Sequence, residues 1–363
     1  MGRNGPTLHH VAERAGVSIA TVSRVARGIG DIAPGTRERV LATIAEMGYR
    51  PNHLGRALVQ RRHETLGIVF PGLRGPYYSE VIHGFEVEAA GTANSVLILG
   101  TELIPHATEQ AVALADRSDG VAIMGGAAID EDEIQRMAVR GVPIVLLARP
   151  PLPGCPAIRV DNRAATRDLT EHLLRDHRYR DLRFVGNIDG APDASERWEG
   201  FLDAHRASGV EPPDAPIPVG LEEWAGAIAG HSIFSQPPLP DAIVAANDEI
   251  AFGIVSVAIA RGVRIPEDVA LTGWDDIPLA RMMTPPLTTV RQPMRELGTE
   301  AARALIAMIG GQEIAQDDRI LPTSVIYRAS CGCSAPDGAH AVGIGIGSEP
   351  SLTPHGKGGG DGP

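Results

Sequence analysis

Short apolar runs alternate with helical stretches from Thr65 to about Ser330, and this alternation constrains the fold more than any other feature of the chain. The apolar runs occupy residues 66–70, 96–100, 121–125, 143–148, 182–186, 242–246 and 269–273. Helical patterns fill most of the gaps, including 78–93, 163–176, 195–208 and 248–261. Strands and helices in alternation predict parallel sheets that are covered by helices on both faces. The body is therefore predicted to be α/β and doubly wound.

This body is too large for one sheet. More than ten elements would make a single sheet too wide, so we divide it into two lobes near Asn162. The stretch LTTVRQP (287–293) carries the chain back, which places a helix at 294–309 on the first lobe. The predicted lobes are 65–162 plus 292–322 and 163–291 plus 323–330, followed by a disordered tail over 331–363.

The first 62 residues are basic, whereas the rest of the chain is acidic. Ten Arg and four acidic residues give this head a net charge of +6, and the remaining 23 basic and 41 acidic residues give −18. A basic segment confined to one end predicts a nucleic-acid contact there. A solvated basic face would carry the same charge, so a motif is needed to decide.

The motif is TLHHVAERAGVSIATVSRVAR, residues 7–27. Thr7 can cap a first helix, Gly16 can end it in the left-handed conformation, and Ser18 can cap a second helix after a short turn. This pattern predicts a helix-turn-helix whose second helix lies in a DNA major groove, with a third helix from residue 34 to 48. A small helical bundle without a DNA role is the alternative, and the basic charge argues against it.

The chain here resembles the LacI/GalR family of bacterial transcriptional regulators. AGVSIATVSRV, TRERVLATIAEMGYRPN, and ALVQRR followed by TLGIVFP match that family's head in order and spacing, and the similarity continues to about residue 330. The resemblance implies a helix-turn-helix domain over 1–50 and a hinge helix with a linker over 51–64. It also implies that the body has the periplasmic-binding-protein type I fold, with a ligand cleft between the lobes.

Three of the positions that depart from the family pattern lie at or near the ends of helices. His10 stands where the family usually has Asp, and Ala33 stands where it usually has a Ser or Thr cap, so the first and third helices are expected to start more weakly. Arg178 stands near a Gly that ends a helix in the left-handed conformation, so we expect backbone strain or a remodelled loop there.

A set of head residues is expected to contact DNA. They are Thr7, Ser18, Ile19, Ala20, Thr21, Ser23, Arg24, Arg27, Asn52 and Leu58. Base reading is predicted for Ile19, Ala20 and Arg24, with Arg24 donating to a guanine edge. In the family, the segment around Leu58 is a hinge helix that folds when two copies meet over the minor groove, and each copy inserts a leucine. A helix of about eight residues is too short to persist alone, so it needs this partner surface, and a plain linker is the alternative.

Polar and aromatic side chains cluster after the predicted strand ends, where ligands bind in open α/β sheets. The candidate effector contacts are Tyr77, Tyr78, Arg149, Asp161, Arg197, Trp198, Trp224, Asn247, Asp248, Trp274 and Asp275. Indole rings beside carboxylate, amide and guanidinium groups suit a sugar. Helix packing for Trp198, a surface position for Trp224 and a helix cap for Asp161 are the alternatives. The resemblance singles out Arg197 and Asp275, which match effector-contacting positions of the family.

These features predict a transcriptional regulator, expected to be a repressor, that binds near-palindromic operator double-stranded DNA as a homodimer. Its small-molecule effector is expected to be a carbohydrate. A purine or another metabolite is the alternative effector, and a transport solute-binding protein is the alternative class. The chain contains no GxSxG, HExxH or Walker loop in a plausible context, so no enzyme and no cofactor is expected. No apolar run approaches the roughly 18 residues that cross a bilayer, so we expect a cytoplasmic protein without a membrane contact.

The three cysteines, Cys155, Cys331 and Cys333, are predicted to be incidental thiols. Their number is odd, they show no CxxC or Cys/His spacing of a zinc site, and the last two lie near a predicted loose end, so no metal is expected. The tail has no leucine heptad of the kind that tetrameric relatives carry. A dimer is therefore expected rather than a tetramer.

Overall fold

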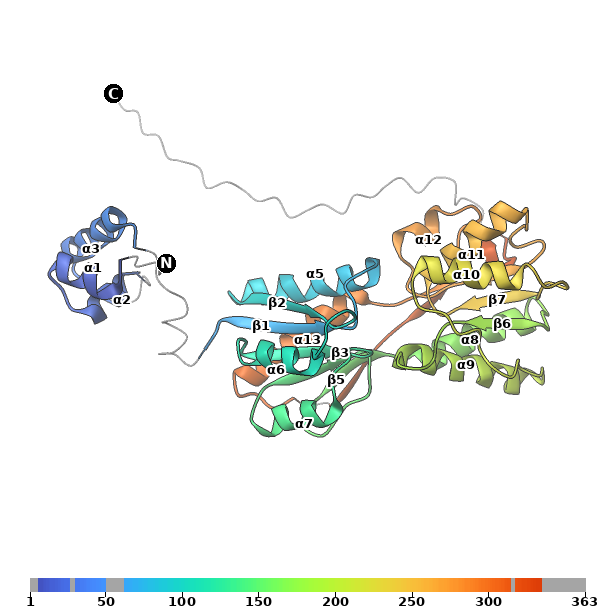
Figure 1. Ribbon diagram of the computed structural model, residues 1–363, viewed down its shortest axis with the longest axis horizontal. Helices are drawn as coiled ribbons and strands as arrows, with labels where there is room; N and C mark the ends of the chain where they lie inside the picture. The colour runs from blue at the N-terminus through green and yellow to red at the C-terminus, as the bar shows by residue number, and fades with distance from the viewer. Residues whose placement is uncertain (1–5, 27–29, 50–61, 315–316, 335–363) are drawn as a thin grey trace, which may run out of the picture. The chain divides into compact units, whose positions relative to one another are not determined.

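The computed structural model describes residues 6–26, 30–49, 62–314 and 317–334 (Figure 1). Contacts divide the chain into two compact units. The first unit comprises Met1–Leu73, Val81–Ile158 and Arg295–Arg319, and the second comprises Arg74–Glu80, Arg159–Met294 and Ile320–Pro363. The chain thus passes between the units three or four residues away from the predicted lobe boundaries, and Arg74–Glu80, expected in the first lobe, groups with the second unit. Every helix among the described residues is too short or too polar to span a bilayer.

The head contains three helices, α1 (Leu8–Ala15), α2 (Ile19–Ala26) and α3 (Pro34–Met47). Gly16 ends α1 with a φ of 64°, and the chain turns directly into α2. The buried core of the head is Val11, Ala12, Ala15, Val22, Val25, Val40 and Tyr49. Leu41 of α3 is 48% exposed and stays outside this core. The predicted helix-turn-helix is confirmed.

The starts of α1 and α3 differ in how their backbone N–H groups are satisfied. Thr7 Oγ1 accepts a hydrogen bond from the His10 backbone N–H at 3.4 Å, and His10 Nδ1 accepts one from the Thr7 N–H at 3.3 Å. The imidazole therefore completes a reciprocal capping box in place of an acidic side chain, so α1 has a side-chain cap in spite of this departure. Ala33 makes no side-chain cap on α3, as expected, and Pro34 begins that helix.

A six-stranded sheet forms the centre of the first unit, in the order β10-β5-β4-β3-β1-β2. Its strands are β1 (Thr65–Phe70), β2 (Ser95–Gly100), β3 (Gly120–Met124), β4 (Ile144–Leu147), β5 (Ala157–Val160) and β10 (Asp318–Leu321). β1 to β5 pair in parallel. The helices are α5 (Pro76–Gly91), α6 (Ala107–Ala115), α7 (Glu131–Val139) and α13 (Met294–Ile309). α5 and α13 cross closely, because a Cβ on Gly84 or on Gly298 would lie 1.9 Å from a backbone oxygen of the other helix.

The second unit contains a parallel sheet in the order β6-β7-β8. These strands are β6 (Leu182–Val185), β7 (Ala242–Ala245) and β8 (Ala270–Thr272). In Figure 1, α10 (Glu223–Ile233) and α11 (Asp248–Arg261) cover one face of the sheet, and α8 (Asn162–Arg175) and α9 (Pro192–Ser208) cover the other. α12 (Pro278–Met282), the antiparallel pair of β9 (Thr289–Arg291) and β11 (Ser324–Ile326), and the 3-10 helix η1 (Ala329–Cys331) complete it. The predicted α/β body with parallel sheets is confirmed.

The end of the second unit differs from the predicted tail. Residues 331–334 are part of the described structure, and Cys331 is fully buried at the end of η1. The Ser330 hydroxyl donates to the Leu271 carbonyl of β8 at 2.6 Å, which holds η1 against the sheet. Arg178 has a φ of 59°, so it takes the left-handed conformation expected for the family's Gly. The prediction that Cys331 and Cys333 lie at a loose end is wrong, and residues 335–363 lie outside the described ones.

Candidate functional site

α2 presents the predicted DNA-reading side chains to solvent. Ile19, Ala20 and Arg24 are exposed, Thr21 and Ser23 are half-buried, and Val22 and Val25 face the core. The helix is capped because Ser18 Oγ accepts from the Thr21 backbone N–H at 3.1 Å. The predicted contacts Arg27, Asn52 and Leu58 lie outside the described residues.

In the second unit, a buried arginine stands at the centre of a polar cluster. Arg197 of α9 is 5% exposed and donates from Nε to Asn162 Oδ1 at 2.9 Å and from one Nη to the Ala246 carbonyl at 2.7 Å. Its guanidinium carbon lies 4.3 Å above the centre of the Trp274 ring, a cation–π geometry. Asp193, one helical turn earlier, places a carboxylate oxygen 3.7 Å from the other Nη. Arg197 is therefore fixed in orientation before any ligand arrives.

The turn after β8 adds a second buried carboxylate. Asp275 is 5% exposed, its backbone N–H donates to the Val290 carbonyl at 2.8 Å, and the Gln292 amide donates to its Oδ1. Its φ is 115° and that of Asp276 is 56°, both in a region that residues with a side chain rarely adopt. The turn thus holds the Asp275 carboxyl in a fixed place at the carboxyl end of the sheet.

Burial disfavours the charged forms of the acids in this cluster. Burial raises the pKa of Asp275 to about 7 and that of Asp193 to about 6, and the nearby Arg197 partly opposes both shifts. Burial, and then the charges of Asp193 and Asp275, raise the pKa of the Tyr77 and Tyr78 hydroxyls as well. The cluster thus holds two carboxyls with pKa values raised towards neutral pH beside one permanent cation. A ligand that donates hydrogen bonds to these carboxyls would favour their charged forms.

Three buried polar atoms around this cluster have no hydrogen-bond partner among the described residues. They are the Tyr77 hydroxyl, Trp274 Nε1 and Gln292 Oε1. Buried polar groups in folded proteins are nearly always paired, and each unpaired one costs about 1–3 kcal/mol. Tyr77 interacts electrostatically with Asp193, Asp275 and Arg197, so these atoms belong to one site. A ligand could therefore accept a hydrogen bond from Trp274 Nε1, donate one to Gln292 Oε1, and do either with the Tyr77 hydroxyl.

Several predicted contacts use their polar atoms within the fold. Asn247 caps α11 through its Oδ1 on the Ile250 N–H and donates to the Leu221 carbonyl. Asp248 is fully buried and accepts from the Ile277 N–H at 3.0 Å and from the Thr289 hydroxyl at 2.7 Å. Asp161 caps α8 on the Ala164 N–H at 2.9 Å.

The two other predicted tryptophans differ in burial from each other. Trp198 packs in the core, stacked on Phe201 with ring centres 5.2 Å apart. Trp224 is 58% exposed, on the same face of α10 as the exposed Ile228. Of the three indoles expected at the effector site, only Trp274 lies against Arg197.

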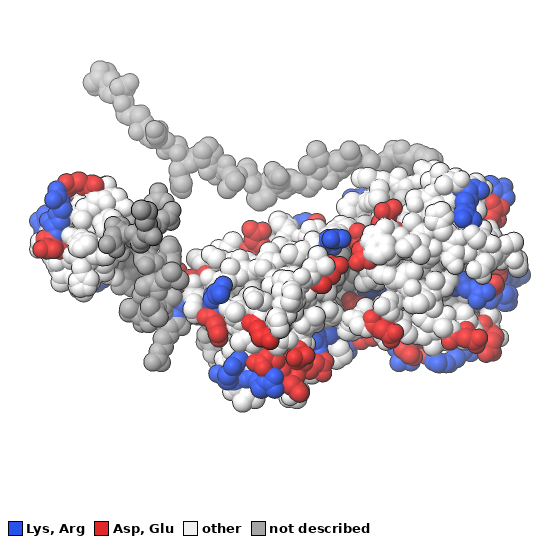
Figure 2. Space-filling view, in the orientation of Figure 1, with Lys and Arg blue, Asp and Glu red and all other residues white. Residues whose placement is uncertain are grey.

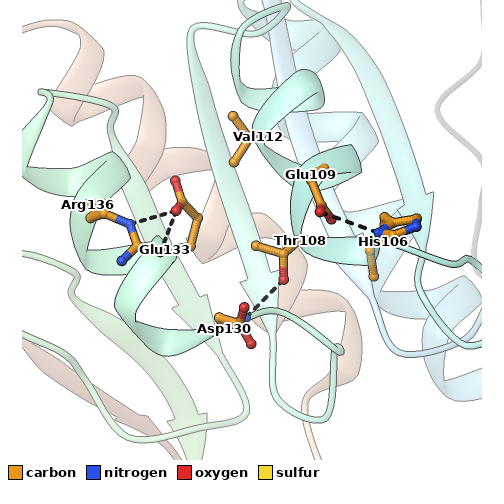
Figure 3. Close-up of a pocket in the computed structure, with 8 residues that line it drawn as sticks. His106, Thr108, Glu109, Val112, Asp130, Glu133 and Arg136 are labelled. Atoms are coloured by element: carbon orange, nitrogen blue, oxygen red, sulfur yellow. Dashed lines mark hydrogen bonds and ion pairs between the residues drawn. The ribbon is translucent and has the colours of Figure 1, made fainter.

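Arg149 lies in the first unit, where it forms an ion pair with Glu131 while its Nε stays without a partner. A surface hollow elsewhere on this unit lies between α6 and α7 (Figure 3). Its polar groups bond one another: Arg136 donates to Glu133 at 2.7 Å, and the Asp130 N–H donates to Thr108 at 3.3 Å. Figure 2 shows Arg and acidic side chains mixed over the part of the unit that carries α7. Because these polar groups already pair with one another, the hollow does not indicate a particular class of ligand.

Sequence reasoning missed Asn162, Asp193 and Gln292 as members of the cluster. Asp193 could have been found, because it lies four residues before Arg197 and shares its helix face. Asn162 and Gln292 reach the site from segments distant in sequence, and no local pattern marks them.

Comparison with known proteins gives the family. Residues 7–52 match the model of bacterial regulatory proteins of the lacI family, and residues 170–331 match the periplasmic binding protein-like domain. The HTH-type transcriptional regulator CelR of Thermobifida fusca is 32% identical over 338 residues, which cover 90% of this chain and 99% of that protein.

Solved structures agree with this assignment. A transcriptional regulator CelR–cellobiose complex aligns with a TM-score of 0.66 and 29% identity, over 90% of this chain and 99% of its own. The lac repressor dimer bound to operator and the anti-inducer ONPF aligns with a TM-score of 0.78 over the same shares at 24% identity, which supports the fold alone. The chain therefore belongs to the LacI family of bacterial transcriptional regulators, with a DNA-binding helix-turn-helix head and a periplasmic-binding-protein-like body.

Proposed function

We propose that this regulator is a repressor that binds a near-palindromic operator as a homodimer, and that a carbohydrate bound at the Arg197–Trp274–Asp275 cluster changes its operator affinity. The observation that carries the proposal is the set of buried, unpaired polar atoms beside two carboxyls and one guanidinium. Ligand binding would supply the missing hydrogen bonds.

The chemistry of the cluster favours a ligand rich in hydroxyl groups. A hydroxyl both donates and accepts, so neighbouring sugar hydroxyls can serve Trp274 Nε1, which needs an acceptor, and Gln292 Oε1, which needs a donor. The carboxylate of Asp275 and the guanidinium of Arg197 can bind adjacent hydroxyls through charge-assisted hydrogen bonds. The cellobiose in the CelR complex is consistent with this class. A purine offers fewer groups that can do both, and it is the alternative effector.

A thermal-shift screen of the full chain tests the ligand class. Monosaccharides, disaccharides including cellobiose, and purine bases and nucleosides are compared at equal concentration, because a ligand that binds the folded state stabilises it by RT ln(1 + [L]/Kd). Hits are then tested with Arg197→Ala and with Arg206→Ala, a matched arginine variant on the same helix whose exposed guanidinium pairs with Asp203. We expect a sugar shift that Arg197→Ala abolishes and Arg206→Ala retains. A purine shift, or a sugar shift that survives Arg197→Ala, would contradict the proposal.

The homodimer proposal rests on the edge of the first unit's sheet. β2 is the last strand of that sheet, and Leu97, Ile98 and the nearby Leu103 are 38%, 44% and 77% exposed. Exposed apolar side chains on an edge strand favour association unless something covers them. A second copy would cover them, and the lac repressor, whose fold this chain shares, was solved as a dimer. Sedimentation at micromolar concentration without DNA should give dimers, and tetramers or monomers would contradict this proposal.

We propose no catalytic role. The residues of the cluster match none of the catalytic motifs sought in the sequence. A transport protein, the other alternative, would have no use for the helix-turn-helix head. An activity screen on the sugar that binds tests this point, because turnover of that sugar would make the chain an enzyme.

A further inference from the structure

Four side chains with metal-binding atoms converge in the second unit. His172 lies on α8 and His177 just after it, whereas Cys331 ends η1 and Cys333 follows two residues later. One ligand atom of each residue lies within 4.8 Å of the others. His172 Nε2 is 3.0 Å from His177 Nε2, 3.3 Å from Cys333 Sγ and 3.8 Å from Cys331 Sγ. His177 Nε2 is 3.4 Å from Cys333 Sγ.

These separations fit the geometry of a tetrahedral zinc site. Zinc binds imidazole nitrogen at about 2.0–2.1 Å and thiolate sulfur at about 2.3 Å. A tetrahedral ion with these bonds holds two nitrogens roughly 3.3 Å apart, and a nitrogen and a sulfur roughly 3.6 Å apart. Four of the six ligand–ligand distances lie within about 0.4 Å of these values, and all six lie within 4.8 Å, so small side-chain adjustments would complete the site.

Neighbouring groups already orient two of the four ligands. His172 Nδ1 lies 2.7 Å from an Asp176 carboxylate oxygen, which leaves the Nε2 lone pair pointing at the cluster. A carboxylate on the outer nitrogen of a ligating histidine is the usual second layer of a zinc site. The buried Cys331 sulfur accepts from the Thr288 hydroxyl at 3.1 Å. The cluster is therefore held from outside by partners that do not compete for the inner lone pairs.

Gly332 lets the two sulfurs approach the histidines together. Its φ is 98°, and a Cβ there would lie 2.9 Å from the Tyr179 hydroxyl and 3.3 Å from the His177 ring. The Tyr179 ring stacks on His177 at 5.3 Å, and the Tyr327 ring lies 4.3 Å from His172. A side chain at position 332 would force this arrangement apart, so the glycine is required by the close approach.

We propose that His172, His177, Cys331 and Cys333 bind one Zn²⁺ in a closed tetrahedral site. Both thiols give their protons to solvent on binding, and both imidazoles bind as neutral rings. Four protein ligands leave no open position, so the role is structural rather than catalytic. The ion would tie residues 331–333 to α8 and the residues just after it, about 150 positions earlier in the chain. It would reduce the freedom of the unfolded state as a long cross-link does.

The metal content of the full chain, with any affinity tag removed, tests the proposal. The chain is purified under reducing conditions without chelator, and zinc is measured by mass spectrometry. Cys333→Ser and His177→Gln remove one ligand each at half-buried positions, which limits the damage to the core. Cys155→Ser and His231→Gln are matched controls, because Cys155 lies in the first unit and His231 is exposed on α10. We expect one zinc per chain in the parent and both controls, and loss of zinc in both ligand variants.

Cobalt substitution provides a readout of the ligand set itself. Reduced, zinc-free parent protein titrated with Co²⁺ should show the visible bands of a tetrahedral ion and a thiolate charge-transfer band, both of which Cys333→Ser weakens. Chelation should lower the Tm of the parent and leave that of Cys333→Ser unchanged. Equal zinc in the parent and both ligand variants, no thiolate band with Co²⁺, or a Cys331–Cys333 disulfide found in the reduced protein would each overturn the proposal.

Discussion

Replacing Asp275 with asparagine should stabilise the ligand-free protein at neutral pH, although it removes a predicted ligand contact. Burial raises the pKa of Asp275 from its ordinary 3.8 to about 7, a shift of about three units. At about 1.4 kcal/mol per unit, ionising this carboxyl costs the folded state on the order of 4 kcal/mol. Because the pKa is raised in the folded state, the parent is not penalised below pH 3.8. It loses this roughly 4 kcal/mol of folding free energy progressively as the pH rises from 3.8 through 7. Asparagine cannot ionise, tolerates positive φ, and keeps an oxygen for the Gln292 amide.

The assay is guanidinium unfolding of parent and variant at several pH values from 4 to 8, with effector titration at neutral pH. The stability gained by Asp275→Asn should be small at pH 4, grow through the interval, and level off above pH 7. Asp268→Asn is the control of opposite sign, because the hydrogen bonds and charge of Arg264 lower the pKa of Asp268 to about 2, so its carboxylate stabilises the protein above that range. Effector response should be lost only in Asp275→Asn. A stability difference that does not depend on pH, or a variant that is less stable than the parent at pH 8, would refute the reasoning.

Three further predictions concern the head and one backbone position. Arg24→Ala should weaken specific DNA binding by about 1–3 kcal/mol and relax preference at one symmetric position; an equal loss on every sequence in a binding-site selection would instead make Arg24 a phosphate contact. Leu58→Ala should lower specific affinity at least tenfold, or about 1.4 kcal/mol, with little change in nonspecific binding. An unchanged ratio of the two affinities, with unchanged DNA bending, would leave a plain linker there. Arg178→Gly should raise the free energy of unfolding by about 1 kcal/mol because it relieves a left-handed φ of 59°, and a lower Tm would contradict this.

The sequence predicted the regular elements of the body well because periodicity is a local property. The helices expected at 248–261 and 294–309 have these bounds in the structure. The short strands β10 and β11 escaped prediction, since three or four residues carry too little pattern. Capping explains another difference. A polar side chain after a strand serves equally well as a ligand or as the cap of the next helix, and in the structure Asn247 is a cap.

Side chains that meet across the fold were the harder part of the prediction. His177 and Cys331 are separated by more than 150 residues, so their proximity depends on η1 folding back onto the sheet. A spacing rule for zinc ligands searches within one short segment and cannot find such a pair. The same holds for Asn162 and Gln292, which join the polar cluster from opposite ends of the Arg159–Met294 segment of the second unit.

The two proposed sites of the second unit are connected through the strained turn after β8. Two successive positive φ values, at Asp275 and Asp276, cost about 1–3 kcal/mol each and persist only where the surroundings fix them. Asp276 accepts from Arg291 Nε at 2.7 Å and from Arg328 Nη2 at 2.6 Å, and Arg328 also donates to the Leu287 carbonyl at 2.8 Å. Arg328 directly precedes η1, whose last residue is a proposed zinc ligand. A metal that fixes η1 would therefore fix Arg328, and through it the turn that presents the Asp275 carboxyl to an effector.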